Sequence, residues 1–250
     1  MTKQIFFICL ITIFLSQLNA YSQGYTPPNL VLGVSLDGNF ATNDAHGSSV
    51  SDPNTYGMVW GRGATLYTKI GFGLRKNHRL TLSATYNHMV NDTENKLPFF
   101  VFTPKEGSPY SKFDIFTGAI GYEYAFNARC RNKQYLGFAV TTNLISGEAF
   151  FVKSPTESVM MTYDNAFRIG AMISTGYEFI IDKNYQVGIL LGLKYHLMNI
   201  LNTQNGVNSL NDGAGTPGPQ FWRRIGMLSL NFGLNFYTGV KPYYGPQYKR

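Results

Sequence analysis

Residues 227–237 read Met-Leu-Ser-Leu-Asn-Phe-Gly-Leu-Asn-Phe-Tyr, in which apolar and polar side chains alternate strictly. Successive side chains of a β-strand point to opposite faces. The apolar positions from Leu228 to Phe236 therefore share one face, and the polar positions from Ser229 to Asn235 share the other. The same pattern recurs about eight times along the chain, and its polar face often carries ionic groups. The sequence thus predicts a β-barrel whose apolar wall faces lipid and whose lumen is polar.

Eight segments have this character, and each is near or above the roughly 9–11 residues that a tilted membrane strand requires. The predicted strands are residues 30–40, 64–75, 79–89, 113–126, 135–145, 166–180, 185–197 and 224–237. The predicted fold class is all-β, an eight-stranded antiparallel up-and-down transmembrane β-barrel.

The connections between these strands alternate in length, which is independent support for the barrel. The long connections are 41–63, 90–112, 146–165 and 198–223, and the shorter ones are 76–78, 127–134 and 181–184. Transmembrane barrels have short periplasmic turns and longer extracellular loops. Because the first and last connections are both long, both termini are expected in the periplasm.

The ends of the chain indicate export. Lys3 precedes an apolar run from Ile5 to Leu15, and Ala20 is a small residue suited to cleavage. We therefore expect a cleavable signal peptide at 1–20, a barrel domain at 21–238 and a short periplasmic C-terminal tail at 239–250. After the leader, no apolar run reaches the 18 residues of a membrane helix.

The polar face carries charges of both signs, three acidic and three basic. They are Asp37, Glu123, Glu178, Lys69, Arg168 and Lys194. Facing lipid, a midplane Lys or Arg costs about 2–4 kcal/mol, so these groups are expected inside. A soluble barrel of the lipocalin kind requires the opposite polarity. Counting from strand ends, we expect Asp37, Lys69 and Lys194 at mid-height, and the two glutamates low, near Arg75.

An eight-stranded barrel is just wide enough for side chains to fill its interior. We therefore expect a plugged, hydrogen-bonded lumen in which the charges pair. Aromatic residues gather at both ends of the apolar face, as is typical of the two membrane interfaces. The expected periplasmic belt is Phe72, Tyr124, Phe126, Tyr177, Phe179, Tyr185 and Phe236, and the outer belt is Phe40, Tyr86, Phe116, Phe167 and Tyr195.

With these features in place, residues 25–238 resemble the small eight-stranded bacterial outer-membrane barrels, namely the transmembrane domain of outer-membrane protein A and the outer-membrane protein X family. The resemblance implies a location in the cell outer membrane among its lipids. The last strand, with Asn231 to Phe236, is similar to the signal read by the barrel-assembly machinery during biogenesis. The resemblance rests on architecture, so it implies the fold far more closely than the activity.

Catalysis has one candidate in the sequence. Some barrels of this kind are enzymes acting on lipid A, and such sites need a serine nucleophile near a histidine base. His46, Gly47 and Ser48 have that spacing, but they lie in a predicted loop rich in Gly and Ser. No metal-ligand spacing or phosphate-binding glycine loop indicates a cofactor. We favour a non-enzymatic structural or interaction role, with a lipid A-modifying enzyme or a small transport-linked barrel as the alternatives.

The long loops are the candidate interaction surfaces. The second loop carries a strongly apolar patch, made of Leu97, Phe99, Phe100, Val101 and Phe102. Apolar groups also occur at 149–152 and 159–161. Either the strands extend past the membrane and these groups pack together, or they form a sticky surface for a protein partner. The formal charge of +7 does not indicate nucleic acid, because the basic residues are spread over separate turns.

Overall fold

The structure is a computed structural model that describes residues 25–46, 57–91, 110–154, 157–201 and 224–242. These residues form strands and their connections. The strands are β1 (Tyr25–Thr26), β2 (Leu30–Asn43), β3 (Trp60–Phe72), β4 (His78–Val90), β5 (Tyr110–Phe126), β6 (Asn132–Ser154), β7 (Glu157–Ile180), β8 (Val187–Leu197), β9 (Ile225–Thr238) and β10 (Lys241–Pro242). In these ranges no helix is long and apolar enough to cross a membrane.

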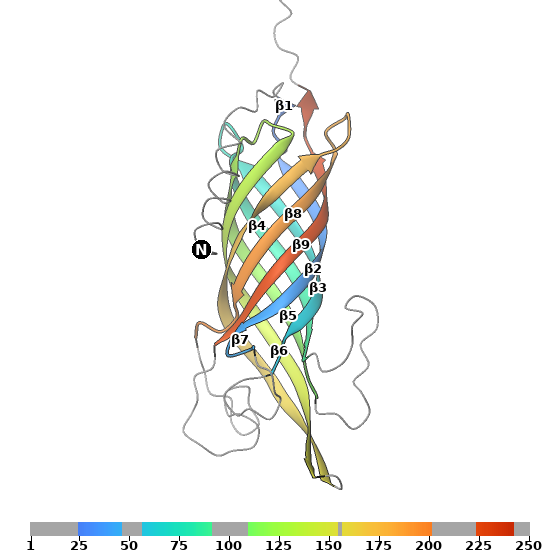
Figure 1. The fold of residues 1–250 in the computed structure, drawn as a ribbon. Helices are drawn as coiled ribbons and strands as arrows, with labels where there is room; N and C mark the ends of the chain where they lie inside the picture. The colour runs from blue at the N-terminus through green and yellow to red at the C-terminus, as the bar shows by residue number, and fades with distance from the viewer. Residues whose placement is uncertain (1–24, 47–56, 92–109, 155–156, 202–223, 243–250) are drawn as a thin grey trace, which may run out of the picture.

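Strands β2 to β9 close a barrel in which each strand pairs with the next one in the chain. All pairs are antiparallel, and β2 closes against β9 from Leu30 opposite Thr238 to Asn43 opposite Ile225. Figure 1 shows the strongly inclined strands around a common axis. The predicted eight-stranded up-and-down barrel is confirmed.

The two ends of the barrel differ. At one end, here called the turn end, residues 73–77, 127–131 and 181–186 join the strands. β1 and β10 pair as a separate two-stranded sheet beside these turns, at the top of Figure 1. At the opposite end, here called the loop end, lie the connections from β2 to β3, β4 to β5, β6 to β7 and β8 to β9.

One predicted connection is wrong. Residues 146–165 were expected as a long loop, but β6 and β7 run through this region and pair as far as Ser154 opposite Glu157. β5 accompanies them, with Tyr110 opposite Phe150 and their ring centroids 5.6 Å apart. The hairpin extends beyond the other strands at the bottom of Figure 1. The apolar residues there therefore belong to strands that continue past the barrel wall and pair with each other.

Side chains alternate between outside and inside as the sequence predicted. On β9, Leu230 and Phe232 are each 55% exposed, whereas Asn231 and Asn235 are buried. A one-residue shift of register would exchange these two sets. The barrel is thus apolar outside and largely polar inside.

The β7–β8 turn shows how a short connection is held. Asp182 accepts hydrogen bonds from the backbone N–H of Asn184 at 3.1 Å and of Val187 at 2.9 Å. Partial burial raises the pKa of the Asp182 carboxyl, but the hydrogen bonds from backbone amides outweigh this and hold the pKa below its usual value. The Asp182 carboxylate therefore stabilises the tight turn through hydrogen bonds to its backbone.

Glycines make room inside for tyrosine rings. A Cβ atom on Gly33 would lie 2.2 Å from the ring of Tyr67, and one on Gly192 would lie 2.6 Å from the hydroxyl of Tyr135. Outside, a Cβ atom on Gly38 would meet no atom within 4 Å. The inward glycines are thus required by the packing of the lumen.

We expect Gly33→Ala to destabilise the barrel by about 1–3 kcal/mol, because the added methyl group displaces the Tyr67 ring from a filled interior. Gly38→Ala, on the same strand but in open space, is the matched control. Urea titration of the refolded barrel in detergent, followed by the mobility of folded and unfolded forms on gels, measures both. Equal midpoints for the two variants would contradict the assigned packing.

Candidate functional site

The outer wall of the barrel is apolar and open. Leu36 and Leu66 are 68% and 65% exposed, and further exposed apolar side chains occur on every barrel strand. On β3 the outward positions from Phe72 to Ala64 span about 20 Å along the barrel axis, at a rise of about 3.3 Å per residue and a tilt of about 40°. An exposed apolar surface of this extent is suited to hydrocarbon rather than to water.

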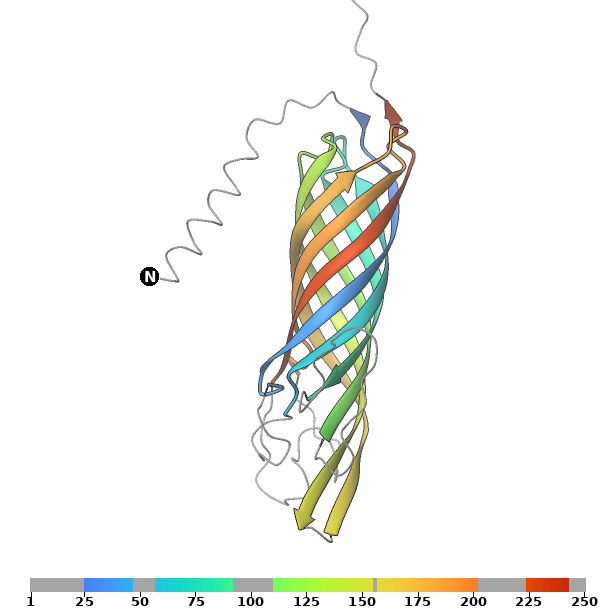
Figure 2. The ribbon, with the colours of Figure 1, turned by 45° about the vertical axis from the view of Figure 1, so that its right-hand side comes forward.

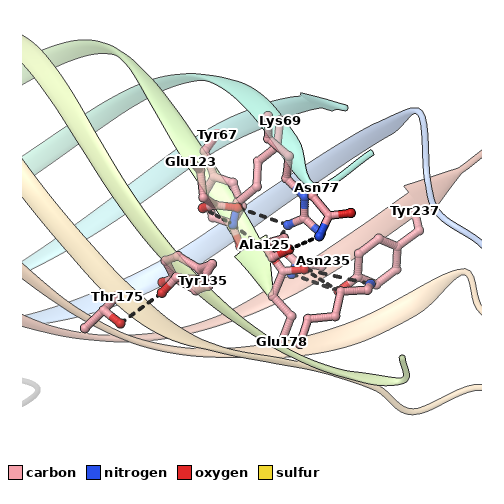
Figure 3. A network of polar contacts seen from close by, with 12 residues as sticks. Tyr67, Lys69, Asn77, Glu123, Ala125, Tyr135, Thr175, Glu178, Asn235 and Tyr237 are labelled. Carbon is pink, nitrogen blue, oxygen red and sulfur yellow. Dashed lines mark hydrogen bonds and ion pairs between the residues drawn. The ribbon is translucent and has the colours of Figure 1, made fainter. Parts of the chain in front are cut away.

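The turn end of the lumen holds five buried charged side chains, here called the ionic cluster: Lys69, Arg79, Glu123, Lys133 and Glu178. Lys69 Nζ lies 2.8 Å from Glu123 Oε2 and 2.7 Å from Glu178 Oε1. Arg79 Nη1 lies 3.0 Å from Glu123 Oε1 and 2.8 Å from Glu178 Oε1. Lys133 Nζ lies 4.0 Å from Glu178 Oε2. The two carboxylates thus bridge three cations across the interior (Figure 3).

Strand pairing brings these groups together. Arg79 of β4 stands opposite Glu123 of β5, and Lys133 of β6 stands opposite Glu178 of β7. Lys69 reaches both carboxylates from β3, on the other side of the cluster. Five consecutive strands therefore contribute one charged residue each, and the cluster ties together more than half of the barrel.

Tyrosine side chains surround the ionic cluster. Tyr67 Oη donates to Asn235 Oδ1 at 2.5 Å, and Asn235 Nδ2 donates to Tyr237 Oη at 3.1 Å (Figure 3). Lys69 Nζ lies 4.3 Å from the ring centroid of Tyr135, and Lys133 Nζ lies 4.4 Å from that of Tyr237. The rings supply cation–π contacts and fill the width that the charged groups leave.

The middle of the lumen is a second polar layer centred on Asp37. Its carboxylate accepts from Ser35 Oγ at 2.9 Å, from Thr65 Oγ1 at 2.5 Å and from Asn231 Nδ2. Lys194 Nζ lies 3.6 Å from Asp37 Oδ2. Beside this pair is a cavity of about 10 Å³, about the room that one water molecule requires. The middle layer is thus closely filled.

Near the loop end the lumen is apolar, which corrects the expectation of a polar interior throughout. Met89, Phe113 and Ile115 are inward and each at most 2% exposed. The whole apolar layer consists of Ala41, Ala45, Met58, Met89, Phe113, Ile115, Ile145, Tyr163, Ala166, Met198, Ile225 and Met227. The reason is local composition: residues 113–116 are apolar at Phe113, Ile115 and Phe116, so alternation alone does not distinguish the two faces there.

All six predicted lumen charges are inside the barrel. Asp37 and Lys194 meet in the middle layer as expected. Lys69 was expected beside them, but its long side chain reaches Glu123 and Glu178 in the ionic cluster instead. Lys194 is half-buried, and the other five charged side chains are buried. Arg168 donates a hydrogen bond to the backbone carbonyl of Phe167 at 2.9 Å.

The prediction that the two glutamates lie near Arg75 is wrong. Arg75 lies exposed in the β3–β4 turn, and Arg79 takes that place with an exposed fraction of 2%. Lys133, with an exposed fraction of 0%, was also missed. Lys133 falls in the predicted connection 127–134, because β6 begins earlier than the predicted strand, whereas Arg79 is the first residue of the predicted strand 79–89 and was not assigned to the lumen. Their parity with Thr81 on β4 and Tyr135 on β6 is the signal that identifies them as inward.

Other candidates lie partly or wholly outside the described residues. The apolar patch at 97–102 and the pair Gly47 and Ser48 fall in undescribed ranges. His46 is described and forms an isolated bridge with Met58. Within the part of the chain that the structure describes, no group of three or more His, Cys, Asp or Glu side chains is placed to hold a metal ion.

Comparison with family models and with curated proteins gives no match. Several solved structures of bacterial surface and outer-membrane proteins have a similar shape. Neisserial surface protein A matches with a TM-score of 0.47 and 12% identity over 84% of this chain and 97% of that one. OprG of Pseudomonas aeruginosa matches with a TM-score of 0.45 and 9% identity over 86% and 99%. Ail of Yersinia pestis has a TM-score of 0.40 and 11% identity over 86% and 99%.

We expect Glu178→Gln to destabilise the barrel by about 3–5 kcal/mol, because it removes one of the two carboxylates that compensate three buried cations. Glu148→Gln is the control, since Glu148 pairs with the half-exposed Lys112 at 2.7 Å on the projecting strands. That change is expected to cost under about 1 kcal/mol. Urea midpoints of the two variants in one detergent give the comparison, and a Glu178→Gln midpoint at or above that of the control would refute the role of the cluster.

Proposed function

We propose that this chain is an integral protein of the bacterial outer membrane, with a plugged lumen and a non-enzymatic structural or loop-mediated interaction role. The observation that carries the proposal is the reversed polarity of the barrel. Leu191, Leu230 and Phe232 are exposed on the wall, while Lys69 and Glu178 are sealed inside. In water this arrangement would expose a continuous apolar surface, whereas in a bilayer both faces are matched to their surroundings.

Three layers of side chains support a plugged lumen. From the turn end to the loop end, these are the ionic cluster, the layer centred on Asp37 and the apolar layer. Each layer is packed or hydrogen-bonded across the barrel. A charged solute would have to displace the salt bridges of Lys69 and Arg79, and it would then meet apolar side chains such as Phe113 and Ile115.

The loop end supports the interaction role. The β6–β7 hairpin projects beyond the other strands, which places its tip farthest from the barrel (Figure 1). The apolar patch of Leu97, Phe99, Phe100, Val101 and Phe102 belongs to the connection from β4 to β5, at the same end. We propose this end as the surface that meets a protein partner outside the cell. Outer-membrane lipids and the assembly machinery are the other proposed partners.

Neither alternative function has a supporting observation among the described residues. Catalysis on lipid A would need a nucleophile, and the proposed Ser48 lies outside the described ranges. Transport would need a path through the lumen, which the three layers oppose. The structural and interaction role therefore accounts for more of the geometry.

The orientation follows from the short turns of such barrels facing the periplasm. In a Cys130→Ala background, we expect Thr162→Cys on the projecting hairpin to react with a membrane-impermeant maleimide on intact cells. We expect Lys183→Cys in the β7–β8 turn to react only after the outer membrane is permeabilised. Both positions are exposed, so access alone decides the outcome.

Labelling of Lys183→Cys on intact cells would reverse the orientation and remove the proposed interaction surface. Equal labelling of both positions in a soluble fraction would remove the membrane assignment as a whole.

The purified barrel is expected to produce no stable channel in planar bilayers, because no layer of its lumen leaves a continuous water path. An eight-stranded barrel with smaller side chains in its lumen, and therefore an open channel, is the positive control for the smallest current that the recording detects. Reproducible current steps of porin size from the unmodified chain would disprove the plug.

A further inference from the structure

The outer wall carries one transverse row of polar side chains near the loop end. Arg62 of β3 stands opposite His88 of β4, His88 opposite Asp114 of β5, and Asp114 opposite Ser146 of β6. Arg62 is exposed and points outward, since its neighbours Gly61 and Gly63 face the lumen side of the strand. The polar row, defined as Arg62, His88 and Asp114, interrupts a largely apolar wall.

The polar row is organised by hydrogen bonds. Asp114 Oδ1 accepts from Tyr86 Oη at 2.5 Å and pairs with His88 Nδ1 at 2.8 Å. His88 therefore stands between Arg62 and Asp114 in the row, with its Nδ1 directed to the carboxylate. The arrangement orients cationic and hydrogen-bonding groups toward one place on the wall.

A hollow lies beside this row, lined by residues of β8, β9, β2, β3, β4 and β5, which are successive neighbours in the barrel; Figure 2 shows β9 and β2 side by side on this face. Its volume is about 1090 Å³, at the upper end of ordinary small-ligand sites. The exposed side chains of Leu36, Phe40, Leu230 and Phe232 stand around Gly38. Gly38 makes the floor low, because no atom lies within 4 Å of the place of its missing Cβ. Arg62, Tyr86, His88 and Asp114 line the other side.

The polar row lies at the edge of the apolar band that is nearer the loop end. Going from the turn end toward the loop end, the outward positions of β3 run from Phe72 to Ala64 and then reach Arg62. On β4 they run from Leu80 to Tyr86 and then reach His88. A cation in the middle of a bilayer costs about 2–4 kcal/mol, but close to zero at its interfaces. The hollow therefore spans the boundary, with apolar walls in the acyl region and the polar row at the headgroup level.

We propose that this hollow binds a phosphorylated glycolipid of the outer leaflet, with acyl chains against Leu36, Phe40, Leu230 and Phe232 and a sugar phosphate on Arg62 and His88. The guanidinium fork of Arg62 matches phosphate geometry. Asp114 acts as a positioning residue, because it holds the His88 ring. The inference rests on the proposed outer-membrane location, and it adds a specific ligand site to it.

The choice of a glycolipid follows from the place and shape of the hollow. It opens at the loop end, which is the outer-leaflet end in the proposed orientation, and a glycolipid with several acyl chains fills a wide hollow better than a lipid with two. The lining, which comes from six neighbouring strands, also offers more contact than one chain requires. Arg62 accounts for the choice of a phosphorylated lipid, and the exposed apolar side chains account for the choice of a lipid with several acyl chains.

Native mass spectrometry of the full chain in non-ionic detergent, titrated with diphosphoryl lipid A, tests the site. We expect Arg62→Gln to lower the apparent affinity about tenfold through loss of the charged hydrogen bonds. We expect Gly38→Leu to lower it by a similar factor, because the new side chain occupies the floor of the hollow, where its Cβ meets no atom within 4 Å. Lys183→Gln, which removes an exposed cation at the turn end, is the matched control and should bind as the unmodified chain does.

Phosphate recognition by Arg62 would be supported if the unmodified chain bound dephosphorylated lipid A more weakly than diphosphoryl lipid A, and if Arg62→Gln bound dephosphorylated lipid A as tightly as the unmodified chain does. An affinity of Arg62→Gln equal to that of Lys183→Gln would overturn the proposal, as would binding of phosphatidylglycerol as tight as that of lipid A. Gel mobility of each variant shows that the barrel is folded. A failure of the membrane assignment appears separately, in the maleimide labelling of Lys183→Cys and Thr162→Cys.

Discussion

The closure of β2 on β9 is the constraint on which the rest of the structure depends. It pairs the backbone from Leu30 to Asn43 with the last barrel strand and leaves no open edge in the eight-stranded sheet. Unpaired N–H and C=O groups in hydrocarbon cost several kcal/mol each, so an open sheet of these strands would have no stable place in a bilayer. Once the sheet is closed, every side chain has one of two environments. The wall and the lumen then follow from parity alone.

The narrow lumen turns those inward residues into one connected interior. Glu123 and Glu178 share Lys69 and Arg79 across the turn end, with tyrosine rings packed against the cations. Replacing water by these contacts is favourable only when each charge finds a partner. The glycines beneath Tyr67 and Tyr135 let the rings cross a barrel that would otherwise be too narrow. The filling of the lumen and the closure of the barrel are thus coupled, since the cluster joins five of the eight barrel strands.

The outer wall has its own organisation, which the alternation of apolar residues hides. Arg62, His88 and Asp114 occupy outward positions at which a purely apolar wall would have aliphatic residues. Their placement in one row arises from the register of β3, β4 and β5. The row borders a hollow over Gly38, so the same wall that meets bulk lipid also offers one place with defined polar geometry. A structural barrel and a lipid-binding barrel are therefore compatible descriptions of this chain.

The sequence by itself determined the number of barrel strands, their up-and-down order and most of the residues that face inward, because a two-residue period is local and survives without any knowledge of partners. It also identified six charged residues of the lumen, since ionic groups on the inward parity have no other stable place. It did not identify Arg79 and Lys133 as lumen charges, or the extension of β6 and β7 to Ser154 and Glu157. The tertiary structure alone decided which charges pair, where the lumen becomes apolar and which outward residues form a row. These depend on inter-strand register and on the width of the closed barrel, and both are set by contacts between residues far apart in the chain.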